Sequence, residues 1–361
     1  MSKAAELAAL IGSQSALSNR NLIINGAMRV AQRSTSVASL SSTATYSTCD
    51  RFEVQYGSSG TFTESQSTTA PSGFSNSLKL DCTTADASPN YLVIMHRMEG
   101  QNLQQLKKGT SAAESTTLSF YVRSSKTGTY QVNLVDNDNT RIIGATYTIS
   151  SANTWEYKSI SFAGDTTGTL DNNNGASLQI EWWLASGSTY NSGAVPTAWE
   201  AMANGDRAAG LNVAIGASTS DDFHITGVQL ELGEQATPFE HRSLGDELLA
   251  CRRYTYKAIA GAAFGHFGGG YAASSTVAYA TLPLPVEMRT NPSLTADGAF
   301  RNYAEDGGKA ITTNPTVLNP GSTTTFTTQA TSSGGGMTDG DFIFLTANND
   351  ADAFLLFDAE L

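Results

Sequence analysis

Short runs in which apolar and polar residues alternate recur along most of the sequence, separated by stretches rich in Gly, Ser, Thr and Asn. Such alternation puts every second side chain on the same face of an extended chain, so each run predicts a half-buried β-strand. The predicted strands before residue 240 are Phe52–Tyr56, Thr61–Thr63, Leu78–Leu80, Leu118–Val122, Tyr130–Val135, Tyr147–Ile149, Tyr157–Phe162, Leu178–Leu184 and Ile225–Leu232, the last with an offset near Gly227. Together they favour a sandwich of two antiparallel sheets over residues 21–239.

Two stretches carry apolar residues at helical spacing instead. Leu7, Leu10 and Ile11 share one face of a short helix predicted within residues 1–20. Ser243 followed by Asp246 resembles a helix start, and a short helix is predicted over Asp246–Arg253, within a connector over residues 240–257. Helices this short are marginal alone in water, so both must pack on something.

Residues 258–361 differ in composition, with clustered glycines between short alternating runs. The predicted strands here are Thr276–Leu284, Ser293–Ala296, Thr323–Thr328, Phe342–Leu345 and Ala353–Phe357. We expect a second, smaller β-sandwich at the C-terminal end. The whole chain is therefore predicted to be mainly β, with an N-terminal helix, a large sandwich, a helical connector and a small sandwich.

The charge balance narrows the range of partners. Only 15% of the residues are charged, and 21 Lys and Arg against 33 Asp and Glu give a net charge of −12. Nucleic acids and anionic bilayers repel such a protein, so we expect it to bind neither. No apolar run is long enough to span a membrane, and the N-terminal sequence MSKAAELAALIG lacks the apolar core of a signal peptide. We expect neither membrane insertion nor secretion by the usual route.

Motifs for catalysis or metal binding are absent from the sequence. The three cysteines are widely spaced, which predicts reduced thiols, and the four histidines lie far apart without a recognisable nucleophile. Adjacent carboxylates, which glycosidases require, occur in polar, turn-like stretches at Asp221–Asp222, Asp246–Glu247, Glu305–Asp306 and Asp350–Asp352. We expect no enzyme, no cofactor and no metal site.

Aromatic residues provide the candidates for sugar binding, because aromatic rings stack on the apolar faces of sugars. Trp182 and Trp183 are neighbours on a predicted strand and must point to opposite faces. One is expected in the core; the other is exposed to a sugar or covered by a loop or by a sister chain. The Gly-rich stretch that begins the small sandwich adds Phe264, His266, Phe267 and Tyr271, which either contact a glycan or line a threefold interface.

Three segments resemble bacteriophage tail fibre and receptor-binding proteins, especially those of short-tailed marine phages: NLIINGAMRVAQR (residues 21–33), GVQLELGEQATPFEHRSLGDELLACRRYTYK (227–257) and FLLFDAEL (354–361). The resemblance implies a virion tail protein that is assembled in the host cytoplasm and binds a host surface glycan or receptor. For a fibre we expect a homotrimer with Leu244, Leu248 and Leu249 in its seam, although in a monomer the same leucines would cap the large sandwich. Leu7, Leu10 and Ile11 are the candidate anchor to a tail adaptor or nozzle protein, unless that helix lies on its own domain.

A second resemblance concerns the large sandwich. Residues 21–28, 117–126, 155–157 and 223–232 are similar to stretches of jelly-roll carbohydrate-binding modules that accompany glycoside hydrolases, which implies a jelly roll over residues 21–239. Those modules often carry an acidic residue where this chain has Thr226–Gly227, so the resemblance does not extend to a structural calcium ion. The function expected from both resemblances is a glycan-binding tail fibre. The alternatives are a purely structural tail adaptor or nozzle-associated protein and, third, a polysaccharide-degrading tailspike.

Overall fold

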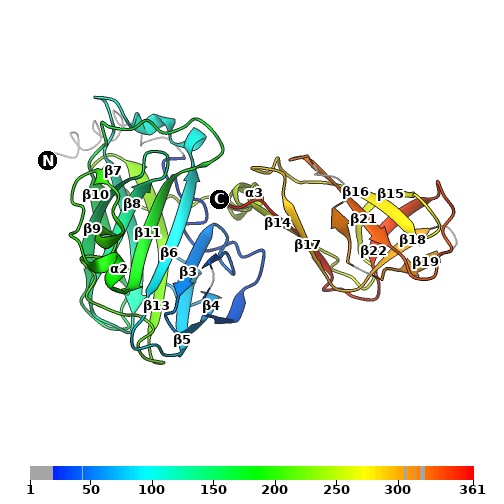
Figure 1. The fold of residues 1–361 in the computed structure, drawn as a ribbon, viewed down its shortest axis with the longest axis horizontal. Coiled ribbons are helices and arrows are strands. Elements are labelled where there is room, and N and C mark those ends of the chain that lie inside the picture. Colours follow the sequence, from blue (N-terminus) through cyan, green and yellow to red (C-terminus); the bar gives the residue numbers. More distant parts are fainter. Residues whose placement is uncertain (1–18, 43, 305–306, 313, 318–321) are drawn as a thin grey trace. The chain divides into compact units, whose positions relative to one another are not determined.

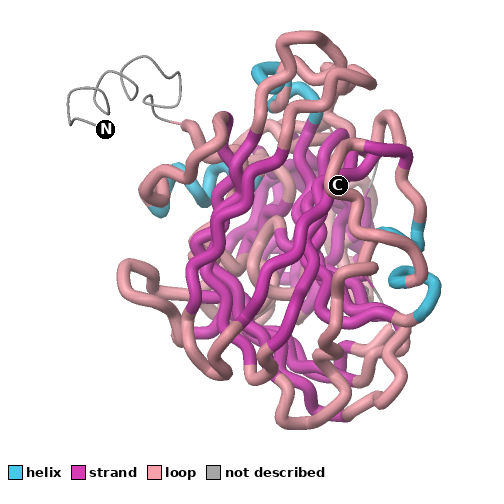
Figure 2. Tube along the Cα trace, turned by 90° about the vertical axis from the view of Figure 1, so that its left-hand side faces the viewer, coloured by secondary structure: helices cyan, strands magenta, loops and turns pink. Residues whose placement is uncertain are grey.

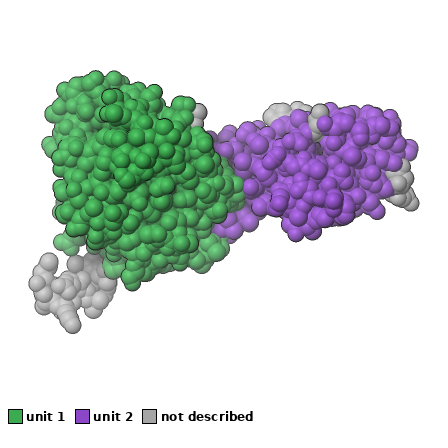
Figure 3. Space-filling model, turned by 90° about the horizontal axis from the view of Figure 1, so that it is seen from below, with its two compact units in different colours: residues 1–247, 361 green, residues 248–360 purple. Residues whose placement is uncertain are grey.

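A computed structural model describes residues 19–361 except 43, 305–306, 313 and 318–321. The predicted N-terminal helix with Leu7, Leu10 and Ile11 lies outside the described residues, as does the pair Glu305–Asp306. The described chain divides into two compact units, one of residues 19–247 with Leu361 and one of Leu248–Glu360 (Figure 3). Strands dominate both units, which confirms the mainly β prediction (Figure 2).

The larger unit is a jelly roll made of two antiparallel sheets (Figure 1). The six-stranded sheet has the order β1 (Ser36–Leu40), β4 (Thr61–Ser67), β5 (Ser77–Thr84), β13 (Asp222–Leu232), β7 (Thr116–Ser124), β10 (Glu156–Phe162). The seven-stranded sheet has the order β12 (Glu200–Ala201), β9 (Arg141–Ile149), β8 (Gly128–Asp136), β11 (Ala176–Ser186), β6 (Tyr91–Glu99), β3 (Phe52–Gly57), β2 (Ala44–Thr45).

Aromatic rings from both sheets meet in the core of the jelly roll. Trp182 from β11 is buried, with its ring centroid 5.9 Å from that of Phe120 in β7 and 6.3 Å from that of Phe52 in β3. Phe223 in β13 packs against Tyr130 in β8 at 5.8 Å. The Trp182–Phe120 and Phe223–Tyr130 contacts join inward-facing positions of the two facing sheets, as the alternation along each strand predicts, whereas Phe52 lies in the same sheet as Trp182.

The outer face of the seven-stranded sheet is covered by its own chain. A long connection between β11 and β13, which contains α2 (Ser188–Asn191) and the 3-10 helix η4 (Asn204–Asp206), lies over β8 and β11. The Arg207 guanidinium in this connection pairs with the fully buried Glu181 carboxylate. Gln131 and Asn133 donate hydrogen bonds from β8 to the carbonyl oxygens of Asp206 and Arg207 at 2.8 and 2.7 Å. A buried polar layer therefore holds this cover in place.

A tight turn at residues 25–28 leads the chain into the jelly roll. Asn25 and Met28 both have positive φ, and the buried Asn25 amide donates to the carbonyls of Val30 (2.8 Å) and Asp50 (2.9 Å). Asparagine tolerates this backbone conformation better than most residues. The expected offset in the last strand is also present: β13 has a bulge between Thr226 and Gln229, where Gly227 has φ 62°.

The connector contains the expected helix, α3, over Leu244–Arg252. The Asp246 N–H donates to the Ser243 side chain at 3.1 Å, which is the N-cap that the sequence predicted. The observed helix begins two residues before the predicted start. It ends at Arg252, one residue before the predicted end at Arg253.

The smaller unit, here called the C-terminal sandwich, packs a three-stranded sheet on a seven-stranded one. The first has the order β14 (Thr255–Ile259), β23 (Phe354–Asp358), β17 (Ser293–Asp297). The second has the order β19 (Gly307–Ala310), β18 (Phe300–Ala304), β22 (Phe342–Ala347), β15 (His266–Ala272), β16 (Val277–Pro283), β21 (Thr325–Thr331), β20 (Thr316–Val317). Phe326 and Phe357 from opposite sheets pack edge to face at 4.9 Å in its core.

One prediction within this unit was wrong. The Gly-rich stretch 266–272 was expected to lie between strands, but it forms β15, a central strand paired with both β22 and β16. The glycines are needed in the strand because a Cβ on Gly270 would lie 1.8 Å from the Tyr279 carbonyl oxygen, and a Cβ on Gly268 would lie 2.6 Å from that of Thr281. Glycine in a strand marks such close approach of a neighbouring backbone.

Candidate functional site

The outer face of the seven-stranded sheet in the C-terminal sandwich carries a cluster of exposed aromatic side chains, which we call the aromatic face. Residues that are paired across neighbouring strands form rows of this face. Tyr303 of β18 pairs with Phe344 of β22, and Phe344 pairs with Gly269 of β15. In the next row Phe342 pairs with Tyr271. Residues distant in sequence thus become neighbours, because alternate residues of antiparallel strands point to the same side of the sheet.

The rings of the aromatic face touch one another. Phe344 lies edge to face with both His266 (4.9 Å between ring centroids) and Phe342 (4.8 Å). The Arg301 guanidinium lies over the rings of Phe264 at 4.3 Å and Tyr303 at 5.0 Å. Each contact restrains a side chain that the sheet exposes, so the face is a preorganised surface with little rotamer entropy left to lose.

A missing side chain shapes the centre of the face. Gly269 points outward between Phe344 and Thr281, and a Cβ there would lie 3.1 Å from Cζ of Phe342. The Phe342 ring therefore lies over the Gly269 backbone, and it still exposes 61% of its surface. Tyr271 and Tyr303 expose 52% and 43%. Large aromatic residues that are this exposed and adjacent on a folded domain mark an interaction site.

Polar groups border the rings. A shallow pocket of about 220 Å³ is lined by Tyr303, Ala304, Asp341, Phe342 and Phe344. The Asp341 carboxylate accepts the N–H of Thr338 at 3.0 Å and contributes an anionic oxygen to the pocket. Rings that offer stacking surface next to a hydrogen-bond acceptor match the two kinds of surface that a sugar presents, its apolar face and its hydroxyls.

The structure separates the six predicted glycan-binding residues. Phe264, His266 and Tyr271 lie on the aromatic face. Phe267 lies in the bulge of β15 between His266 and Gly268 and turns inward, where its ring packs on Phe300 at 5.4 Å.

Trp182 and Trp183 are both buried, so neither ring is available to a sugar. Trp183 is the one that points away from the core, and the connection between β11 and β13 covers it. Tyr190 packs on its ring at 5.0 Å, Arg207 stacks over it at 5.2 Å, and its Nε1–H donates to Glu181 at 2.9 Å. The second indole was expected to be exposed to a sugar, covered by a loop or covered by a sister chain, and in this unit a loop covers it.

Tyr303, Phe342 and Phe344 are site residues that were not among the predicted ones. One local signal was present: in Phe342-Ile343-Phe344-Leu345 both the inward and the outward positions are apolar, unlike most strands of this chain. A solvent-facing strand with large apolar residues on both sides indicates that its outer face has a use.

The candidates for a trimer seam lie on α3. Leu244 and Leu249 are exposed and Leu248 is half-buried. All three residues remain candidates for a contact with a further chain.

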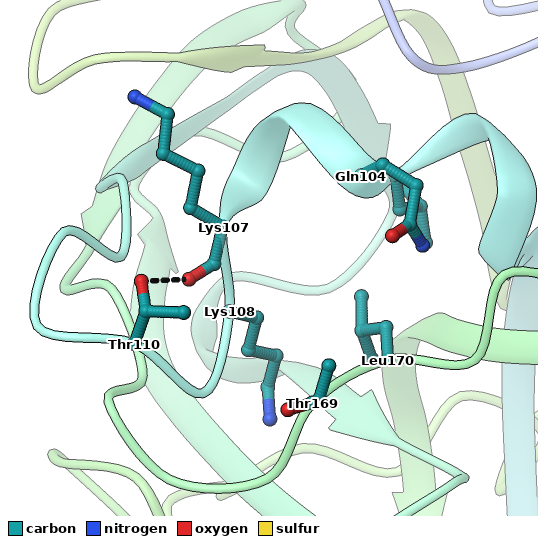
Figure 4. A pocket seen from close by; sticks show the side chains of 7 residues that line it. Gln104, Lys107, Lys108, Thr110, Thr169 and Leu170 are labelled. Carbon is teal, nitrogen blue, oxygen red and sulfur yellow. Dashed lines mark hydrogen bonds between the residues drawn. The ribbon is translucent and has the colours of Figure 1, made fainter.

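A second pocket, of about 340 Å³, lies at the edge of the jelly roll and is lined by Leu103, Gln104, Lys107, Lys108, Thr110, Thr169 and Leu170 (Figure 4). Its two lysines point in opposite directions, and only the Lys107 amine is exposed. The buried Lys108 ammonium pairs with Asp136 and with Asp165 (3.0 Å) and donates to the carbonyl of Gly168 at 3.0 Å. Because Lys108 is already surrounded by oxygens, it is a structural residue.

The described carboxylate pairs are used by the fold. Asp221 accepts the N–H groups of Gly216 and Ser218 at 3.0 Å each, and Asp350 accepts that of Ala299 at 2.9 Å. Among the residues that the structure describes, no three His, Cys, Asp or Glu side chains gather as metal ligands. The helices of that same part are all too short or too polar to span a membrane.

Comparison with known proteins gives matches at the level of structure alone. No family model matches the sequence. The search of curated proteins finds no match.

Among solved structures, the enzymatically active domain of tailspike protein 4 of bacteriophage CBA120 matches 59% of this chain at 12% identity with a TM-score of 0.31, and the match spans 22% of that protein. The family 11 carbohydrate-binding module of Clostridium thermocellum, solved with a mixed-linked tetrasaccharide, matches 52% of this chain at 10% identity (TM-score 0.29, 91% of that chain). The N-terminal cellulose-binding domain of Cellulomonas fimi β-1,4-glucanase C matches 52% at 11% identity (TM-score 0.26, 90% of that chain).

Proposed function

We propose that this chain is a bacteriophage tail fibre protein whose C-terminal sandwich binds a glycan on the host cell surface. The observation that carries the proposal is the aromatic face, where Phe342, Phe344, Tyr271 and Tyr303 expose adjoining rings on a rigid sheet. The resemblance of residues 21–33, 227–257 and 354–361 to phage tail fibre proteins supports the assignment to a virion.

The mode of binding follows from the chemistry of the face. Stacking on rings and hydrogen bonds to Asp341 and the tyrosine hydroxyls would hold a sugar with little help from long-range attraction, because the chain has a net charge of −12 and bacterial surfaces are commonly anionic. Affinity per site is then weak. A homotrimer that presents three faces would raise the overall affinity through effective concentration.

In this proposal the described helix α3 contributes to assembly. Leu244 and Leu249 are exposed on this nine-residue helix, and in the proposed trimer they would pack against two further copies of the chain. The remaining parts of the proposal are attachment of the N-terminal residues to a tail adaptor or nozzle protein and location in the virion tail. We further propose that the chain acts by binding and not by catalysis.

The test measures binding of the full-length protein to immobilised surface polysaccharides from a panel of bacteria, with Phe342→Ala and Tyr271→Ala as variants. We expect each variant to lose binding while Ile259→Ala, an equally exposed hydrophobic residue on the other sheet, retains it. Thermal unfolding of all three variants should match the wild type, because the substituted side chains are exposed.

Three outcomes would contradict the proposal. Retained binding by both aromatic variants would place recognition elsewhere. A fall in sedimentation mass of Phe342→Ala would make the aromatic face an assembly surface, which corresponds to the structural tail-component alternative. Release of reducing sugar from a polysaccharide by the wild type would support the tailspike alternative.

A further inference from the structure

A groove on the outer face of the six-stranded jelly-roll sheet is independent of the aromatic face. It has a volume of about 490 Å³, and all of its lining residues belong to the jelly roll. Its floor is formed by β7 and β13, and one wall comes from the segment that follows β13. Pockets that hold small ligands commonly fall within ~300–1,000 Å³, so the groove is large enough for one or two sugar rings.

Ring side chains surround this groove. Phe74 is at the centre, with ring centroids 5.0 Å from Phe239, 5.2 Å from His241 and 5.5 Å from Tyr121. Tyr157 pairs with Tyr121 across β10 and β7, with the rings 5.0 Å apart, and stands at the rim with 47% of its surface exposed. The exposed ring is available for stacking, and the inner rings hold it in place.

The bulge in β13 fits the chain to this arrangement. Gly227 has φ 62°, and a Cβ at this position would come within 2.7 Å of the Phe74 ring and 3.0 Å of the Tyr121 ring. Only glycine satisfies both the backbone conformation and the close approach of two rings.

The uncharged polar groups that line the groove favour a neutral ligand over a charged one. Among the residues that the structure describes, no Asp, Glu, Lys or Arg lines the groove, and its polar side chains are hydroxyls and the His241 imidazole. Ser119, which exposes only 3% of its surface, lies in the floor of the groove on β7. A charged ligand would lose its hydration here without gaining an ion pair, whereas a neutral sugar matches rings with its C–H face and Ser119 with a hydroxyl.

From this geometry we propose that the groove is a second carbohydrate site, specific for a neutral hexopyranose, and that it binds independently of the aromatic face. A fibre with two kinds of site on one chain would engage two positions of a glycan layer and gain avidity from both.

Histidine labelling tests this proposal on the full-length protein. Of the four histidines, His241 lines the groove, His266 lies on the aromatic face, and His96 and His224 are buried in the jelly roll. With the imidazoles labelled with ¹³C and assigned by single His→Gln substitutions, the protein is titrated with the methyl glycosides of glucose, galactose and mannose, and with methyl glucuronide as the charged probe. We expect the His241 signal to shift saturably with at least one neutral glycoside, and to a lesser extent or not at all with the glucuronide.

Tyr157→Ala should weaken the glycoside affinity measured at His241 roughly three- to tenfold, which is the loss expected for one stacking contact. It should leave the titration of the His266 signal with glycoside unchanged. The matched control is Tyr271→Ala, which removes an equally exposed ring from the aromatic face and should leave the His241 response intact. A His266 signal that no glycoside shifts, together with a His241 signal that shifts saturably, would contradict the proposed function of the C-terminal sandwich and support this inference. Failure of the proposed function and failure of this inference are therefore distinguishable.

Several results would overturn the inference. They are a His241 signal that no neutral glycoside moves, a response that Tyr157→Ala does not weaken, and a glucuronide response as large as the neutral one. A His241 shift that depends on protein concentration would make the groove a contact between copies. A shift on deletion of residues 1–18 would make the N-terminal segment its occupant, since Arg20 donates to the carbonyl of Pro238 in the groove wall.

Discussion

Replacing Glu64 by glutamine should remove a large pH dependence from the stability of the jelly roll. Glu64 lies on β4 with its side chain turned into the core and fully buried. Burial raises the pKa of its carboxyl group from 4.5 to about 7, although hydrogen bonds from the Thr48 hydroxyl (2.6 Å) and the Tyr56 hydroxyl (3.2 Å) oppose the shift. The folded state therefore keeps this proton over a pH range in which the unfolded chain releases it.

The direction of the effect follows from which state binds the proton more tightly. Below about pH 4.5 the carboxyl is protonated in both states and Glu64 carries no ionisation penalty. As the pH rises towards 7 the unfolded state ionises first, so the free energy of unfolding falls. A pKa raised from 4.5 to about 7 corresponds to a loss of about 3 kcal/mol, at about 1.4 kcal/mol per pKa unit. Glutamine has the shape of the protonated side chain and cannot ionise, so Glu64→Gln should equal the wild type near pH 4.5 and exceed it by about 3 kcal/mol at pH 8.

Urea unfolding followed by tryptophan fluorescence isolates this effect, because all four tryptophans (Trp155, Trp182, Trp183 and Trp199) belong to the jelly roll. The control is Glu156→Gln. Burial opposes ionisation of Glu156 too, but hydrogen bonds from Lys158 and from the Ser150 and Ser151 N–H groups outweigh it and lower the pKa of Glu156 below 4.5. That variant should therefore be less stable than the wild type by an amount that grows as the pH rises to about 4.5 and stays constant above it. A difference between Glu64→Gln and the wild type that stays constant from pH 4.5 to 8 would refute the reasoning.

Three further predictions concern the two units and their assembly. Lys108→Met should destabilise the jelly roll by about 3–5 kcal/mol in urea unfolding, because two buried carboxylates lose their ammonium partner. Gly270→Ala should destabilise the C-terminal sandwich by about 1–3 kcal/mol in calorimetry and leave the tryptophan-monitored transition unchanged, because the added Cβ would lie 1.8 Å from the carbonyl oxygen of Tyr279. Leu249→Asp should lower the sedimentation mass of the intact protein from three chains towards one, because it puts a charge in the proposed seam.

Each of these three predictions has a control variant or an outcome that would refute it. Lys107→Met removes an exposed lysine, 53% accessible and paired with Glu114 on the surface, and should change stability by less than about 1 kcal/mol. Equal effects of the two lysine substitutions would refute the buried ion-pair argument. A tryptophan transition that shifts with Gly270→Ala would mean that the two units unfold together. A wild-type protein that sediments as a monodisperse monomer would refute the trimer.

Local sequence pattern determined most of the secondary structure of this protein. Alternation located the main strands of the jelly roll, because burial of one sheet face selects apolar residues at every second position. Gly227 marked the bulge in β13 and Ser243 marked the start of α3, because each of these local conformations favours one or a few residue types.

Tertiary structure alone decided which of those residues form a site. Trp183 satisfies the sequence criteria for a sugar-binding ring, yet it is covered by the connection that carries Tyr190 and Arg207. Conversely, Tyr303 and Phe344 are ordinary strand residues until the pairing of β18, β22 and β15 places them in one row with Gly269. The physical reason is that a sheet surface is assembled across hydrogen-bonded neighbours that are far apart in sequence, whereas the alternation within each strand specifies only which side chains share a face.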